Sequence, residues 1–101
     1  MTITGIHLII SGMVQGVGFR FSTRQKASEL GITGRVRNIR GGRLECIAEG
    51  DKEVIEKFID WCRKGPPAAS VESVQTINRK VKDSRAYNDF TVEYGSYPFK
   101  I

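Results

Sequence analysis

Alternating apolar and polar positions along the chain predict five strands, and two stretches with apolar residues at helical spacing predict two helices. We expect strands near residues 7–12, 33–38, 44–49, 71–78 and 90–94, and helices near residues 21–30 and 51–64. The order is strand–helix–strand–strand–helix–strand with one additional C-terminal strand. This order predicts an α+β fold, a two-layer sandwich with two helices on one face of a largely antiparallel sheet.

The side chains that form the core follow from the same spacing. The second helix carries the clearest apolar stripe, which consists of Val54, Ile55, Phe58, Ile59 and Cys62. The first helix turns Phe19, Thr23, Ala27 and Leu30 inward, and we expect Phe90 and Tyr94 of the last strand in the core. Glycines stop the helices at Gly31 and Gly65, and the run from Arg40 to Arg43 contains the Gly41-Gly42 pair of a hairpin.

Length and composition favour a single domain over residues 1–101, because 101 residues with 40% hydrophobic content build one core and not two. The longest run of large apolar residues, Leu8-Ile9-Ile10, is far too short to cross a membrane, and no export signal is visible. We therefore expect a cytoplasmic protein without a membrane partner. The two cysteines, Cys46 and Cys62, lack metal-ligand spacing and favour buried free thiols, although a disulfide between them is compatible with the sequence.

The net charge of +5 favours anionic partners. Four arginines cluster in the second strand and the hairpin after it, namely Arg35, Arg37, Arg40 and Arg43. A solvated basic face and a nucleic-acid surface explain such a cluster equally well, and a small anionic substrate also benefits from its field.

The segment from Gly12 to Arg20 carries the most specific chemistry. A strand runs into three glycines, Gly12, Gly16 and Gly18, and then into an arginine at the start of a helix. Such a junction points main-chain N–H groups at one place, and the planar guanidinium of Arg20 suits a phosphate. The glycines fit neither the Walker loop nor the dinucleotide fingerprint. A phosphate site and a glycine-rich turn without a ligand are therefore both compatible with this loop.

A family resemblance favours the phosphate site. The pattern Gly12-x-Val14-Gln15-Gly16-Val17-x-Phe19-Arg20 resembles the signature of the acylphosphatases. The similarity continues through Gly31-x-x-Gly34-x-Val36-x-Asn38-x-x-Gly41-Gly42 and Gly65-Pro66-Pro67, and extends over about residues 6–94. Some positions depart from the usual family pattern, namely Arg35, Gly41 and Glu93, and the residues after Tyr94 extend beyond the usual family end.

The resemblance implies a ferredoxin-like βαββαβ fold and the hydrolysis of carboxyl-phosphate anhydrides to a carboxylate and inorganic phosphate, without a metal or other cofactor. It also implies the site. The phosphate-binding loop corresponds to Gln15, Gly16, Val17, Gly18, Phe19 and Arg20, and the two catalytic residues are the phosphate-binding Arg20 and the water-orienting Asn38. The partner is then a small-molecule acyl phosphate, with inorganic phosphate as product. We expect a monomer, and nucleic acid is not an expected partner.

The residue types fit this reaction, because neither Arg20 nor Asn38 titrates at a working pH. An acyl phosphate needs no protein acid, since its carboxylate leaving group has a conjugate acid with a pKa near ~4. Two other functions are compatible with the pattern. An RNA-binding module of the same architecture needs aromatic residues on its central strands, which this chain lacks there. A regulatory domain of a larger assembly is the other alternative.

Overall fold

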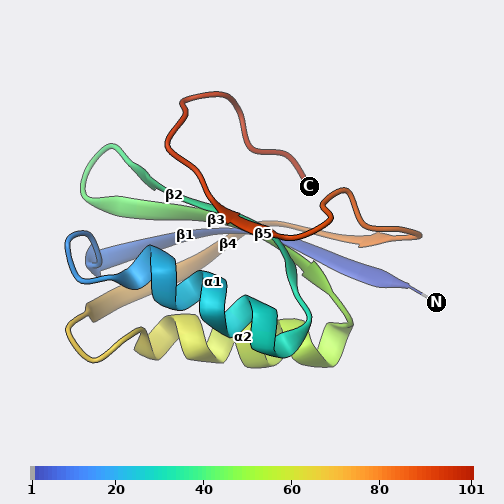
Figure 1. Cartoon of the computed structure of the whole chain (residues 1–101), viewed down its shortest axis with the longest axis horizontal. Helices are drawn as coiled ribbons and strands as arrows, with labels where there is room; N and C mark the ends of the chain where they lie inside the picture. Colours follow the sequence, from blue (N-terminus) through green and yellow to red (C-terminus); the bar gives the residue numbers. More distant parts are fainter. Residues whose placement is uncertain (1) are drawn as a thin grey trace.

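A computed structural model describes residues 2–101, in which five strands form one sheet and two helices pack against one of its faces (Figure 1). The strands are β1 (Ile3–Met13), β2 (Thr33–Ile39), β3 (Arg43–Gly50), β4 (Ser70–Lys82) and β5 (Phe90–Val92), and the helices are α1 (Phe19–Leu30) and α2 (Lys52–Lys64). The predicted two-layer α+β sandwich is confirmed, with the ferredoxin-like order β1-α1-β2-β3-α2-β4 followed by the additional strand. Neither helix is long and apolar enough to cross a membrane, as far as residues 2–101 show.

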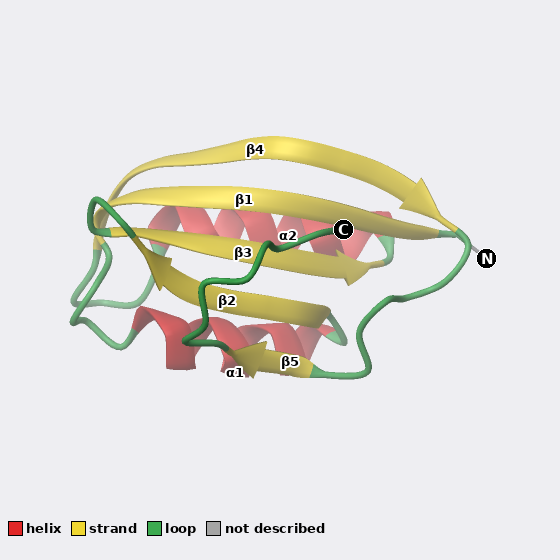
Figure 2. Ribbon diagram, turned by 90° about the horizontal axis from the view of Figure 1, so that it is seen from above, coloured by secondary structure: helices red, strands yellow, loops and turns green. Residues whose placement is uncertain are grey.

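The strand order in the sheet is β4-β1-β3-β2-β5 (Figure 2). The first four strands pair antiparallel, which confirms the expected largely antiparallel sheet, whereas the additional strand β5 pairs with β2 in parallel. The reason is the path of residues 83–89. This segment runs from the end of β4 past the ends of the central strands to the start of β2, where the Gly34 N–H donates to the Asp89 carbonyl at 2.9 Å. The chain therefore enters β5 at the end where β2 also begins.

Strand β1 lies at the centre and is longer than its alternating pattern predicts. It begins at Ile3 and not at His7, because Ile3 pairs with β4, Thr4 to Ile6 pair with both β3 and β4, and all four residues are buried. Strand β4 likewise continues past Asn78 to Lys82, paired with the first residues of β1. The predicted hairpin turn is confirmed, with φ angles of 83° at Gly41 and 74° at Gly42.

The core lies between the helices and the sheet. Four members of the predicted α2 stripe are buried, namely Ile55, Phe58, Ile59 and Cys62, and they face Ile6, Leu8, Ile10, Leu44, Cys46 and Ala48 of the central strands. The rings of Phe58 and Phe90 approach to 6.1 Å between centroids. Cys46 and Cys62 are buried free thiols, so no disulfide joins them, and burial raises the pKa of both thiols.

The C-terminal segment, residues 93–101, lies on the other face of the sheet, opposite the helices (Figure 1). Figure 2 shows this segment leaving β5 and crossing over β2 and β3. Phe99 is its buried side chain on this face. Tyr94 is 75% exposed, so its predicted place in the core is wrong. The reason is that β5 ends at Val92, two residues before the tyrosine.

Buried Glu49, near the end of β3, binds the segment of residues 83–89 where it passes the ends of the strands. Its carboxylate accepts hydrogen bonds from Lys82 at 2.6 Å, from the Ala86 N–H at 3.0 Å and from the Tyr87 N–H at 2.7 Å. Burial alone raises the pKa of this carboxyl, but the Lys82 ammonium and the two main-chain amides outweigh burial and hold the pKa below its usual value. Glu49 thus fastens the segment that leads into β5 and the C-terminal residues.

Candidate active site

Residues 14–18 connect β1 to α1, so the predicted phosphate loop at residues 15–20 consists of most of this connection and the first two residues of α1. Val14 and Phe19, at its two ends, are each 1% exposed, so the loop is held at both sides by core side chains. The hydroxyl of buried Thr23 donates to the Phe19 carbonyl, one helical turn earlier, at 2.7 Å. The loop itself is exposed between these anchors, except for half-buried Val17.

Gly16 and Gly18 give the loop its shape. Both have a φ of 75°, a left-handed conformation that other L-residues adopt only at a cost. Gly18 is also the N-cap of α1, and its carbonyl accepts the first helical hydrogen bond from the Ser22 N–H at 3.0 Å. No side chain caps this helix among the described residues, and no acidic residue lies in its first turn. The first main-chain N–H groups of α1 are therefore directed toward the loop without a helical partner.

The Gln15 side chain ties the loop to the β2–β3 hairpin. Its amide N–H groups donate to the Ile39 carbonyl at 3.0 Å and to the Arg43 carbonyl at 2.9 Å. Both acceptors lie at the end of the hairpin that also carries Asn38, which pairs with Leu44. Both side-chain N–H groups of Gln15 are thus occupied in bracing the loop, and only its main-chain N–H is left to donate to an anion.

Arg20 is the second residue of α1 and is half-buried. Its guanidinium carbon lies 5.1 Å from the centroid of the Tyr94 ring, within the range of a cation–π contact. None of the ion pairs among residues 2–101 involves Arg20, so no carboxylate of that part of the chain neutralises its charge. A positive charge at a helix N-terminus is disfavoured by the helix dipole, and an anion beside it removes this conflict.

Asn38 is exposed and lines a cavity of about 480 Å³. The residues around this cavity come from the loop, the hairpin and the C-terminal segment, and are Gln15, Arg37, Asn38, Ile39, Arg40, Tyr94, Gly95 and Ser96. Tyr94 lines the cavity that Asn38 also lines and contacts Arg20 on α1. The structure therefore connects the two predicted catalytic residues through this tyrosine. Val17 and Phe19 contribute their side chains to the core, so they offer only main-chain groups to a ligand.

The side chains of the predicted arginine cluster lie in different environments. Arg37 is 7% exposed, pairs with Glu45 at 2.7 Å and lies beneath the C-terminal segment. Arg35 lies between the rings of Tyr87 and Tyr97, at 4.9 and 5.4 Å from their centroids. Arg40 lines the cavity. The cluster is therefore not one continuous solvated basic face.

The part of the chain that the structure describes contains no group of three or more histidine, cysteine or acidic side chains placed to hold a metal ion. The sequence did not predict that Tyr94, Gly95, Ser96 and Arg37 line the cavity. The usual family end at Tyr94 gave no pattern for the residues after it, and only the cluster of arginines around Arg37 pointed to this region.

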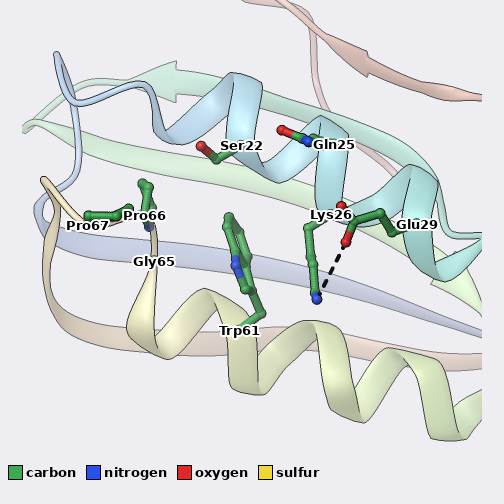
Figure 3. A pocket seen from close by; sticks show the side chains of 8 residues that line it. All are labelled: Ser22, Gln25, Lys26, Glu29, Trp61, Gly65, Pro66 and Pro67. Atoms are coloured by element: carbon green, nitrogen blue, oxygen red, sulfur yellow. Dashed lines mark ion pairs between the residues drawn. The ribbon is translucent and has the colours of Figure 1, made fainter.

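A second hollow lies between the two helices, on the face of the molecule away from the C-terminal segment (Figure 3). It has a volume of about 290 Å³ and is lined by Ser22, Gln25, Lys26, Glu29, Trp61, Gly65, Pro66 and Pro67. Half-buried Trp61 packs its ring edge-on against Phe19 at 5.6 Å between centroids. The hollow shares no lining residue with the cavity at Asn38 and contains none of the predicted site residues.

Comparisons with known proteins agree with this geometry. The family model named acylphosphatase matches residues 6–92. A curated acylphosphatase of Acaryochloris marina is 48% identical over 82 residues, which cover 81% of this chain and 88% of that protein. The solved structure of an acylphosphatase from Coxiella burnetii superposes with a TM-score of 0.79 at 42% identity, covering 90% of this chain and 93% of that one.

A similar fold also occurs inside a larger protein. The structure of full-length HypF in the phosphate- and nucleotide-bound form superposes with a TM-score of 0.77 at 30% identity, and the match covers 91% of this chain but 12% of that chain. The family is decided by the match of the family model over residues 6–92 and by the two acylphosphatases, which are similar along nearly their whole length. The chain belongs to the acylphosphatase family of enzymes.

Proposed function

We propose that the loop at residues 15–20, together with Arg20 and Asn38, carries out the hydrolysis of acyl phosphates that characterises this family. The observation that carries the proposal is the convergence of three features. A left-handed glycine loop meets an uncapped helix N-terminus, an arginine without a carboxylate partner lies in the first helical turn, and an exposed asparagine lines the adjoining cavity.

The phosphate group is held by main-chain N–H groups of the loop and the first turn of α1, and by the Arg20 guanidinium. These donors are fixed by the buried anchors Val14 and Phe19 before a ligand arrives. Phosphoryl transfer depends mainly on such positioning and on stabilisation of the charge on the equatorial oxygens. The planar fork of the guanidinium binds two phosphate oxygens at once, which an ammonium cannot do.

Asn38 orients the attacking water. Its carboxamide both donates and accepts hydrogen bonds, so it holds a water by one lone pair and leaves another directed at phosphorus. The bond from phosphorus to the carboxyl oxygen breaks as the bond from water to phosphorus forms, and the carboxylate leaves without a proton. The water proton passes to an oxygen of the phosphate, so that no side chain has to titrate.

The test is the hydrolysis of benzoyl phosphate by the purified protein, before and after treatment with EDTA. We expect turnover that EDTA does not change. Asn38→Ala removes the water contact but not the phosphate contacts, so we expect kcat to fall about 100-fold or more with the inhibition constant of orthophosphate within about threefold. An Asn38→Ala protein with the kcat of the intact chain contradicts the role of Asn38, and an intact chain without turnover contradicts the function.

The structure gives the RNA-binding alternative no support. Strands β1 and β3, at the centre of the sheet, carry no Phe, Tyr or Trp, and residues 93–101 cross over part of the face on which RNA-binding modules stack bases (Figure 2). A single domain over residues 1–101, a cytoplasmic location and a monomeric state stay predictions.

A further inference from the structure

One wall of the cavity at Asn38 lies outside the family match. The match ends at residue 92, whereas Tyr94, Gly95 and Ser96 line the cavity together with Asn38 and Arg40. Gly95 and Ser96 also lie beyond the usual family end at Tyr94, so what they contribute is a property of this chain's own C-terminal segment.

Arg37 holds this wall in place. One guanidinium nitrogen, Nη1, donates to the carbonyls of Gly95 and Tyr97 at 2.8 and 2.5 Å, while Nε donates to Glu45 at 2.8 Å. The Phe99 ring lies on the guanidinium, 3.9 Å from its carbon to the ring centroid. A buried arginine next to Asn38 in sequence thus uses its fork to fix the backbone on both sides of Ser96.

Two further contacts fasten the rest of the segment. The Tyr87 hydroxyl donates to the Lys100 carbonyl at 2.8 Å, and Arg35 donates to the Tyr97 hydroxyl at 2.8 Å. The Tyr97 hydroxyl in turn donates to Glu93. Side chains of the sheet and of residues 83–89 therefore hold the segment along its length, and the wall is an ordered part of the cavity.

The chemistry of the wall indicates what it faces. Its side chains are an exposed aromatic ring and a hydroxymethyl group, and the Gly95 carbonyl is already bonded to Arg37. Tyr94 also contacts Arg20, so the ring lies where a phosphate on Arg20 continues into the rest of the substrate. The cavity of about 480 Å³ has room for an acyl group much larger than acetyl.

We propose that Tyr94, Gly95 and Ser96, held by Arg37, form the subsite for the acyl group and favour acyl phosphates with a flat apolar acyl group. This inference rests on the proposed function, because the acyl group follows from a phosphate held at Arg20. The residues act on the part of the substrate that does not react, so they affect KM for large acyl groups and leave kcat for small ones unchanged.

The experiment compares benzoyl phosphate with acetyl phosphate in two variants. The first variant ends at Tyr94 and lacks residues 95–101. The second is Ser96→Trp, which fills the cavity and keeps every contact of Arg37. Ser84→Trp, at an exposed position in the segment after β4, is the control for a surface tryptophan. Thermal unfolding and orthophosphate inhibition verify that each variant keeps its fold and its phosphate site.

For both variants we expect KM for benzoyl phosphate to rise about three- to tenfold, which is about the value of one aromatic contact, because the truncation removes the support of the Tyr94 ring and the tryptophan occupies the space of the acyl group. The constants for acetyl phosphate should stay within about twofold. Ser84→Trp should match the intact chain. If the intact chain hydrolyses both substrates and Ser96→Trp changes neither KM, or changes both equally, the inference is wrong and the proposed function stands. If the intact chain hydrolyses neither substrate, the proposed function is wrong and the inference with it.

Discussion

The Gln15 side chain is the direct link between the phosphate loop and the hairpin that carries Asn38, and Gln15→Ala tests its role. The substitution removes both hydrogen bonds to the Ile39 and Arg43 carbonyls and nothing from the core, because Gln15 is exposed. The loop keeps its buried anchors, Val14 and Phe19, but loses its connection across to β2 and β3. We expect a protein that folds but in which the loop is no longer held at a fixed position relative to Asn38.

The two effects differ in size. A neutral hydrogen bond contributes about 0.5–1.5 kcal/mol net, and because water replaces Gln15 at these exposed carbonyls, we expect the free energy of unfolding to fall by about 1 kcal/mol in total. For a domain of this size, that change lowers Tm by about 4–8 °C. A misplacement near 1 Å costs about 100-fold in rate, so we expect kcat/KM for benzoyl phosphate to fall about 10- to 100-fold.

The assay measures benzoyl phosphate hydrolysis at 25 °C beside a thermal unfolding curve for the same sample. Gln25→Ala is the matched control, because Gln25 is an exposed glutamine on α1 outside the cavity at Asn38. Its kcat/KM should equal that of the intact chain. If Gln15→Ala loses stability as expected but keeps the kcat/KM of the control, the bracing of the loop against the hairpin has no part in catalysis.

Three further predictions follow from particular contacts. Glu49→Gln leaves Lys82 and two main-chain amides without their carboxylate, and we expect it to lower the free energy of unfolding at pH 7 by about 3 kcal/mol in urea titrations; a loss under about 1 kcal/mol contradicts the account. Because the folded pKa of Glu49 is lowered, its contribution is complete above the unfolded pKa and is lost as the pH falls through the folded value, so the urea midpoints of the intact chain and Glu49→Gln should converge in acid. Gly18→Ala places a methyl group in open space on a residue with a φ of 75°, and we expect about 1 kcal/mol of backbone strain and weaker inhibition by orthophosphate. Unchanged inhibition would show that phosphate binding does not depend on the left-handed conformation at this position.

Much of the fold could be predicted because its elements obey simple periodicities. The α2 stripe from Ile55 to Cys62 and the Gly41-Gly42 turn each carry a local signal that the tertiary structure reinforces. The ends of β1 and β4 had no such signal. Ile3 to Ile6 are all buried, so they do not alternate, and the extension of β4 is set by its pairing with them.

The site was predictable as a set of residues but not as a cavity. The loop and Arg20 are contiguous, and the resemblance added Asn38. Tyr94 was misplaced because an aromatic residue two positions after Val92 continues an alternating pattern, while the strand ends before it. The wall at Gly95 and Ser96 depends on hydrogen bonds from Arg37 to main-chain carbonyls, and carbonyls have no signature in sequence.

The central claim is that main-chain donors of the loop and the Arg20 guanidinium together hold the phosphate group. Calorimetric titration of orthophosphate into the intact chain, Asn38→Ala and Arg20→Lys tests it without the need for turnover. We expect the first two to bind with Kd values within about threefold, and Arg20→Lys, which keeps the charge and loses the planar fork, to bind at least about tenfold more weakly. Equal binding of orthophosphate by all three proteins would contradict the account.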